Sequence, residues 1–204
     1  QDTKDFRDIA REREAICHLI ASTKNEIKRI LQTTFPELES ICNIFTTTML
    51  LFLKAFPSAR LIRASNPKVV AEALDRCSKG RKVSIGADEI IKAAKSSIAS
   101  NSLAKEVILS QKISTLLHLM EQLDNISNVL SELCKSIAIE EMEIITSIDG
   151  IGDVTGAVFL AEVGDIKKFS SHKSLIAYAG IDPTVFQSGK FEGTSRISKR
   201  GNRH

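Results

Sequence analysis

The first hundred residues alternate between stretches with a helical spacing of apolar positions and short breaks at proline or glycine. From about residue 5 to residue 34, apolar or small residues recur every three or four positions, which predicts an amphipathic helix that Pro36 ends. A second helix is predicted from residue 37 to residue 54, with Pro57 as its stop. Two shorter helices are predicted over residues 67–80 and 87–100.

The longest periodic stretch follows and has the spacing of heptad a and d positions. Its apolar or small residues are Leu109, Ile113, Leu116, Met120, Leu123, Ser127, Leu130, Cys134 and Ile137. This spacing predicts a seam for a partner helix, as in a coiled coil. Two partners remain open at this point. One is the stripe over residues 9–30, folding back as a helical hairpin, and the other is the same helix in a second subunit.

The composition changes near residue 143. Before it, glycine occurs only in a predicted turn, whereas eight glycines follow it: Gly150, Gly152, Gly156, Gly164, Gly180, Gly189, Gly193 and Gly201. We therefore predict a mainly α protein with a domain boundary within residues 140–145. Residues 1–143 are expected to form a helical linker with a coiled coil, and residues 144–204 a small helical domain with a basic C-terminal loop.

Composition and charge narrow the class of protein. With 43% hydrophobic and 26% charged positions, the 204 residues can bury a core. No apolar run approaches the roughly 18 to 20 residues of a membrane span, and the charged start of the chain contains no signal peptide, so a cytoplasmic protein with no membrane partner is expected. A net charge of +3 is too small to identify a nucleic-acid binder by itself.

The cysteines offer no metal site. They are scattered, with no CxxC pair and no nearby histidine: Cys17, Cys42, Cys77 and Cys134. We interpret them as reduced thiols and expect no metal bound by this chain.

The sequence IDGIGDVTGA at residues 148–157 predicts two helices around a Gly-x-Gly turn, as in a helix-hairpin-helix motif. Gly150 and Gly152 would let the turn bend and let backbone N–H groups approach a phosphate, near the positive end of a helix beginning at Asp153. The alternative is a tight turn without a ligand, which Asp149 and Asp153 favour because carboxylates repel phosphate.

Tyr178 is the only tyrosine and lies near the end of a helix predicted over residues 169–180, with serine at its start and glycine at its stop. A recombinase nucleophile is one interpretation of such a residue. Its Ala-Tyr-Ala-Gly setting favours a packing role instead.

The C-terminal end is locally basic and contains a serine that precedes glycine. Ser188 is followed by cations that outnumber the single acid Glu192: Lys190, Arg196, Lys199, Arg200 and Arg203. Such a loop has what phosphoryl transfer through a serine requires, namely a hydroxyl and cations to stabilise phosphate oxygens. Because no histidine or other evident base is near Ser188, the chemistry by itself favours a loop that only holds DNA.

Several of these segments together resemble the C-terminal domain of the insertion sequence 110/116/902 type transposases, a family of RNA-guided bridge recombinases. They are SIDGIG at 147–152, AEVGDI at 161–166 leading to Phe169, AYAGIDP at 177–183, QSG at 187–189 and ISKRGN at 197–202. A looser resemblance to the family's helical linker covers residues 11–38 and 56–57.

The resemblance implies specific roles. Ser188 corresponds to the serine that becomes covalently linked to DNA during strand exchange, and Gly150 and Gly152 to a turn that contacts the DNA backbone. The expected phosphate binders are Lys190, Arg196, Lys199, Arg200 and Arg203. The family's coiled coil helps to pair subunits, so DNA, a guide RNA and a second copy of the chain are the expected partners.

In this family an N-terminal RuvC-type domain supplies four acids that bind a divalent metal such as Mg²⁺. The present sequence begins after the point where those acids are expected, so none of its acids is assigned to that site. We therefore expect a fragment that binds DNA weakly and is inactive alone.

Three hypotheses follow from the sequence. The first is a DNA transposase, or recombinase, of a mobile insertion sequence whose Ser188 attacks a phosphodiester. The second is a non-catalytic helix-hairpin-helix module that binds branched DNA. The third is a coiled-coil scaffold without a nucleic-acid role. The role of residues 37–100 is not indicated by any motif.

Overall fold

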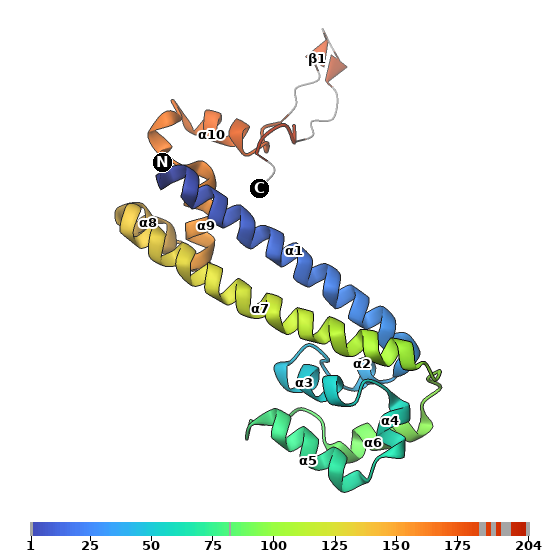
Figure 1. Ribbon diagram of the computed structural model, residues 1–204. Coiled ribbons are helices and arrows are strands. Elements are labelled where there is room, and N and C mark those ends of the chain that lie inside the picture. The colour runs from blue at the N-terminus through green and yellow to red at the C-terminus, as the bar shows by residue number, and fades with distance from the viewer. Residues whose placement is uncertain (1, 82, 184–186, 189–190, 193–196, 203–204) are drawn as a thin grey trace. The chain divides into compact units, whose positions relative to one another are not determined.

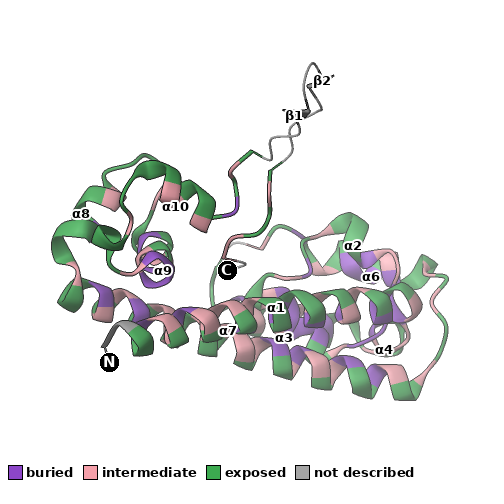
Figure 2. Cartoon of the chain, turned by 90° about the horizontal axis from the view of Figure 1, so that it is seen from above, coloured by how far each residue is buried: buried purple, intermediate pink, exposed green. Residues whose placement is uncertain are grey.

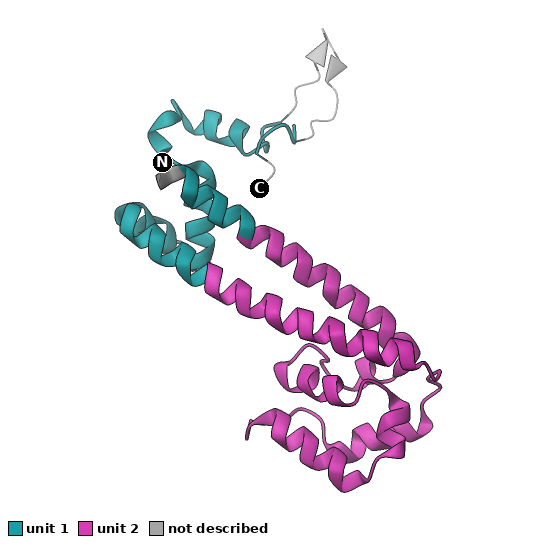
Figure 3. Ribbon diagram, viewed as in Figure 1, with its two compact units in different colours: residues 1–12, 127–204 teal, residues 13–126 magenta. Residues whose placement is uncertain are grey.

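The computed structural model describes residues 2–81, 83–183, 187–188, 191–192 and 197–202, with the backbone alone for residues 2, 3, 187, 188, 191 and 192. The fold is mainly α, as predicted (Figure 1). The chain forms two compact units, residues 13–126 and residues 1–12 with 127–204 (Figure 3). Two long helices, α1 (Asp2–Thr34) and α7 (Leu103–Ile137), contribute to both units.

The contiguous unit, residues 13–126, is built on an antiparallel pair formed by the later part of α1 and the first part of α7 (Figure 1). The heptad positions Leu109, Ile113 and Leu116 are fully buried in one apolar cluster that also contains Ile20 and Ile27 of α1. This part of the predicted seam of α7 is therefore buried within the same chain, in a cluster to which α1 contributes. Pairing with a second subunit stays a prediction.

Between these two helices the chain forms five short helices, which are α2 (Leu38–Ile41), α3 (Thr47–Ala55), α4 (Ala59–Ala64), α5 (Pro67–Ser78) and α6 (Ala87–Ser96). The single helix predicted over residues 37–54 is wrong. It is interrupted because Asn43 accepts a hydrogen bond from the Phe45 N–H in a turn, and because Thr46 caps α3 by accepting one from the Met49 N–H. Polar side chains that bond to the backbone override the apolar pattern here.

The boundaries of α5 follow the predicted signals. Asn66 caps its start by accepting from the Lys68 N–H at 2.9 Å, Pro67 is its first residue, and Lys79 and Gly80 end it with φ angles of 51° and 76°. The helix α4 was not predicted from the sequence. It starts at the buried Ser58, which accepts a hydrogen bond from the Leu61 N–H.

The discontinuous unit joins residues 1–12 to the last third of the chain. It contains α8 (Ile139–Thr146), α9 (Asp153–Val163), the 3-10 turn η1 (Ile166–Lys168), α10 (His172–Tyr178), β1 (Gln187–Ser188) and β2 (Phe191–Glu192). Its buried cluster, purple in Figure 2, consists of Phe6, Ala10, Leu130, Cys134, Met142, Ala157 and Ala161. The two units are defined by contacts within the folded chain, whereas the boundary predicted within residues 140–145 was based on glycine content. That predicted boundary stays a prediction.

The helices α8 and α9 pack closely against each other at Gly156 of α9. A Cβ atom on Gly156 would lie 2.6 Å from Cγ2 of Ile145 and 3.2 Å from Sδ of Met142, so the two helices approach as closely as a bare backbone allows. Between them, Gly150 takes a φ of +91° and Gly152 precedes the first residue of α9. Two helices thus flank a glycine turn as predicted, while the assignment as a helix-hairpin-helix motif stays a prediction.

Within the described residues, no helix is both long enough and apolar enough to cross a membrane.

Candidate functional site

The segment that follows α10 doubles back on itself and forms a short stem, which comprises residues 180–183 and 197–202. The Lys199 N–H donates to the Gly180 carbonyl at 2.9 Å, and the Ser198 N–H donates to the Asp182 carbonyl at 2.9 Å. Pro183 and Ile197 form an antiparallel bridge beyond them. The basic C-terminal segment expected to be a loop thus contains regular antiparallel pairing.

The base of the stem requires glycine in both of its legs. Gly180 has a φ of +70°, and a Cβ atom on Gly201 would lie 2.1 Å from the Gly180 nitrogen and 2.2 Å from the Tyr178 carbonyl oxygen. Side chains do not tolerate such distances to backbone atoms, so the two legs can touch only as glycines. The Asn202 N–H donates to the Tyr178 carbonyl at 2.6 Å and closes the base.

Ser188, the predicted nucleophile, is in β1, which comes between the two legs of the stem in sequence and pairs with β2 in an antiparallel manner. Its Cα is paired with that of Phe191, and Gln187 is paired with Glu192. The side chain of Ser188 lies outside the described part of the structure, as do three of the predicted phosphate binders, Lys190, Arg196 and Arg203. The predicted catalytic role is therefore neither supported nor opposed by side-chain geometry.

Two predicted phosphate binders are described and both are exposed. Lys199 and Arg200 lie in the returning leg of the stem, one or two residues before Gly201. Lys199 has a φ of +53°, which an ordinary side chain adopts at some energetic cost. Within the described residues, neither cation makes an ion pair.

Gly150 and Gly152 lie apart from the stem in sequence, in the exposed turn before α9. A Cβ atom at either position would meet no atom within 4 Å, and no side chain caps the helix at Gly152. The first residue of α9, Asp153, forms an ion pair with Lys135 at 2.6 Å, and this hydrogen bond raises the pKa of Lys135. Lys135 thus offsets part of the negative charge that opposes phosphate at this turn.

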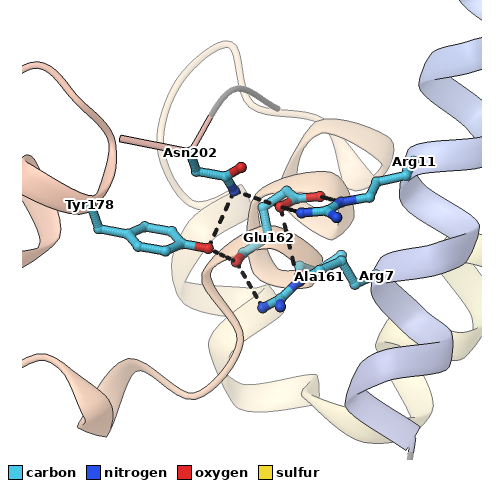
Figure 4. A network of polar contacts seen from close by, with 6 residues as sticks. All are labelled: Arg7, Arg11, Ala161, Glu162, Tyr178 and Asn202. Atoms are coloured by element: carbon cyan, nitrogen blue, oxygen red, sulfur yellow. Dashed lines mark hydrogen bonds and ion pairs between the residues drawn. The ribbon is translucent and has the colours of Figure 1, made fainter. Parts of the chain in front are cut away.

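The most connected polar group of this unit is Glu162, near the end of α9 (Figure 4). Its side chain is 8% exposed, and its carboxylate accepts two hydrogen bonds from Arg11, from Nε at 2.9 Å and from Nη2 at 3.1 Å. It also accepts one from Nδ2 of Asn202 at 2.6 Å. The bond to Glu162 raises the pKa of the Arg11 guanidinium.

The backbone around Glu162 is held as well. Arg7 donates to the carbonyls of Ala161 and Glu162 at 3.2 and 3.1 Å, and the Tyr178 hydroxyl donates to the Glu162 carbonyl at 2.8 Å. The ring of Tyr178 packs edge-on against Phe169, with centroids 5.3 Å apart. These contacts give Tyr178 the packing and hydrogen-bonding role that its sequence setting favoured.

Sequence reasoning missed this network as a unit, although one signal was present. Glu162 is an acid within the apolar run VFLAEV at 158–163, and a carboxylate there is tolerated only if it has a buried partner. Nothing in the sequence indicated that its partners would be Arg11 and Asn202, 151 and 40 residues away.

The cysteines take no part in these sites. All four are free, and burial raises the pKa of Cys42 to about 11. Burial also raises the pKa of Cys134, whose Sγ lies 3.6 Å from Sδ of Met142. Within the described residues, no three His, Cys, Asp or Glu side chains are grouped so that they could hold a metal ion.

Comparisons with known proteins find a match that is confined to this C-terminal part. Residues 142–204 match the model of the transposase IS116/IS110/IS902 family. Over 63 residues the chain is 40% identical to a transposase for insertion sequence element IS1111A of Coxiella burnetii (strain RSA 493 / Nine Mile phase I), which covers 31% of this chain and 17% of that protein.

A second relative is an insertion element IS116 uncharacterized 44.8 kDa protein of Streptomyces clavuligerus. It is 38% identical over 64 residues, which is 31% of this chain and 16% of the relative. The chain thus matches about a sixth of the length of these relatives. No solved structure matches the chain. In agreement with the resemblance found in its motifs, residues 142–204 are similar to the transposase IS116/IS110/IS902 family.

Proposed function

We propose that this chain is part of a DNA transposase that acts on an insertion sequence, with Ser188 as the nucleophile of strand exchange. The family match over residues 142–204 carries this proposal, because the relative from Coxiella burnetii is itself described as a transposase. Two features of the stem support it: the backbone of Ser188 lies in a short strand pair that comes between the two legs in sequence, and the returning leg carries exposed cations at Lys199 and Arg200.

In the proposed step, Oγ of Ser188 attacks the phosphorus of a DNA phosphodiester. One phosphorus–oxygen bond to the serine forms and one to a deoxyribose oxygen breaks, so the number of phosphodiester bonds is unchanged. The hydroxyl proton is lost to solvent or to a base, and the released deoxyribose oxygen gains a proton. Lys199 and Arg200 would stabilise negative charge on the non-bridging oxygens.

Among the described residues, no group of side chains fits the divalent metal that the family resemblance implies. The described residues group no three potential ligands, so we assign no metal-binding role to them and derive no step through a metal. Such an ion, Mg²⁺ being the simplest, would have to be held by other parts of the complete protein. A guide RNA and a second copy of the chain are proposed partners on the strength of the family alone.

The test is a search for a covalent protein–DNA adduct with the complete protein. A suicide duplex with a nick beside the cleavage site traps the adduct, because the released strand diffuses away and cannot be rejoined. Ser188→Ala is expected to abolish the adduct, and Ser170→Ala, a change at an exposed serine of the same unit, is expected to leave it intact. An adduct that persists in Ser188→Ala would exclude this serine as the nucleophile.

A second candidate function is a non-catalytic module that binds branched DNA through the turn between α8 and α9. The exposed Gly150–Gly152 turn at the uncapped start of α9 favours it, because backbone N–H groups there can face a phosphate. Gly152→Val is the informative change, since Gly152 has an ordinary φ of −90° and open space around it. Salt-sensitive binding to forked DNA should fall in this variant and persist in Ser188→Ala.

A further inference from the structure

Glu162 occupies a place where a carboxylate is unfavourable unless it is fully paired. It is the only acid in the run VFLAEV at 158–163, and its side chain is 8% exposed. A buried carboxylate loses its hydration, and it is stabilised only if charged or polar donors replace the lost water. The bidentate contact with Arg11 and the single bond from Asn202 supply these donors.

These donors belong to segments that are far apart in sequence. Arg11 lies in α1, and Asn202 directly follows Gly201 at the base of the stem (Figure 4). One carboxylate therefore joins the N-terminal helix, α9 and the returning leg of the stem. The amide of Asn202 also donates to the Tyr178 hydroxyl at 3.2 Å, which links the leg to the end of α10.

The Asn202 side chain is the link that ties the base of the stem to the helical body. The backbone bonds of the stem connect its two legs with each other and with the end of α10, through Gly180, Asp182 and Tyr178. Within the described residues, the amide of Asn202 joins the returning leg directly to α9, whereas Tyr178 joins them indirectly through the end of α10. The strand pair formed by Gln187–Ser188 and Phe191–Glu192 lies between the two legs of this stem in sequence.

We propose that Glu162, acting through Asn202 and fixed by Arg11, is a positioning residue for the strand pair that carries Ser188. The proposal rests on the function proposed above. It needs no contact between Glu162 and DNA. A small rotation at the base of a stem becomes a larger displacement at its tip, and a misplacement of about 1 Å at a reacting group can cost on the order of a hundredfold in rate.

The first arm of the test measures adduct formation in the complete protein. Asn202→Ala removes the link and leaves the pair of Arg11 and Glu162 intact, so the helical body is retained. We expect the rate at saturating DNA to fall at least tenfold, while the DNA concentration for half-maximal rate changes less than threefold. Glu106→Gln is the matched control, because Glu106 is equally buried and clasped by Arg60 but lies in the other unit. It is expected to keep the rate within twofold.

The second arm is hydrogen exchange at the Lys199 amide, which donates to the Gly180 carbonyl in the stem. Asn202→Ala and Glu162→Gln should each speed this exchange at least tenfold, and Glu106→Gln should not. This readout needs no activity, so it separates the two proposals. If Ser188→Ala still forms the adduct, the proposed function fails and exchange alone decides the positioning role. Unchanged exchange in Asn202→Ala, or an unchanged rate in that variant, overturns the inference.

Discussion

Among the residues whose side chains are described, each of the two units contains one buried glutamate, and the two carboxylates accept similar hydrogen bonds. Counted over the whole residue, Glu106 is 4% exposed and Glu162 is 6% exposed. Each carboxylate accepts two hydrogen bonds from an arginine whose side chain is about 40% exposed. A third donor completes each clasp, the Ser58 hydroxyl at 2.6 Å for Glu106 and the Asn202 amide for Glu162. These hydrogen-bond donors of the two carboxylates are thus similar in kind, although Glu162 also has Arg7 Nε at 4.0 Å.

The difference lies in what each clasp connects. Ser58 and Arg60 lie within 48 residues of Glu106, and all three belong to the contiguous unit, so that clasp fastens the start of α4 to α7. Arg11 lies 151 residues from Glu162, and the second partner is in the C-terminal stem. The same arrangement of atoms thus stabilises a compact subdomain in one unit, and in the other it unites distant parts of the chain around the candidate site.

The largest expected effect comes from removing each arginine. In Arg60→Ala, Glu106 keeps the Ser58 hydroxyl but loses its counter-charge, and the free energy of unfolding of that unit should fall by about 3 kcal/mol. In Arg11→Ala, Glu162 keeps Asn202 and has Arg7 Nε at 4.0 Å as a substitute, so the loss should be nearer to about 2 kcal/mol. Native-state hydrogen exchange resolved by unit measures both. Equal losses would show that Arg7 does not substitute.

The next largest effect is expected from replacing two glycines, Gly201, which contacts Gly180 at its φ of +70°, and Gly80, which has a positive φ itself. Gly201→Ala forces a methyl group against backbone atoms of Gly180 and Tyr178, which should destabilise the discontinuous unit by about 3 kcal/mol. Gly80→Ala, at a φ of +76° with open space around it, should cost only about 1 kcal/mol in the other unit. Thermal unfolding followed by circular dichroism compares the two variants. A milder effect at Gly201 would mean that the stem can open at little cost.

A smaller effect is expected when the pH is lowered, because the protonation of Glu106 weakens the contiguous unit. The hydrogen bond from Arg60 holds the pKa of Glu106 below its usual value, against the opposing influence of burial and with help from Ser58. Because the folded-state pKa is lowered, this contribution to stability is complete above the unfolded pKa of about 4.3 and is lost as pH falls through the folded value. Urea unfolding of the 13–126 unit between pH 6 and pH 3 should reveal the loss. Glu106→Gln should flatten this dependence, and a wild-type slope in that variant would contradict the assignment.

The smallest effect is expected at the exposed pair of Lys135 and Asp153, whose side chains are each about half exposed. Lys135→Met should change the free energy of unfolding by less than about 0.5 kcal/mol, since solvent screens exposed ion pairs. Salt at 0.5 M should remove the difference between variant and parent. A loss above about 1 kcal/mol would show that Lys135 matters for more than its charge.

Much of the fold could be predicted from the sequence, because apolar spacing indicates the buried face of a helix and capping residues indicate its ends. The stripe of α1, the seam of α7, and the start of α5 at Asn66 and Pro67 follow from spacing and from caps that act over three or four residues. The break at residues 42–46 was missed, because side-chain bonds from Asn43 and Thr46 interrupt a run whose apolar pattern is continuous.

The candidate site was only partly predictable, for a related reason. The motifs around Gly150, Tyr178 and Gly201 identified the family, and the match over residues 142–204 agrees with them. Motifs record neighbours in sequence, whereas Arg7 and Arg11 reach Glu162 only after the chain has returned across 150 residues. The sequence around Arg7 and Arg11 has the pattern of a solvent-exposed helix face, and it does not indicate that these side chains contact Glu162.

The discontinuity of the unit that holds the stem also has a consequence for synthesis on the ribosome. Residues 13–126 are contiguous and can acquire their own core while later codons are still being translated. The other unit cannot, because Phe6 and Ala10 are made first and wait for Met142, Ala157 and Ala161. Asn202 emerges after all of them. The hydrogen bonds to Glu162 can therefore form only after all of these segments have been synthesised, and an expression boundary drawn at residue 142 would remove Arg11, one of the donors.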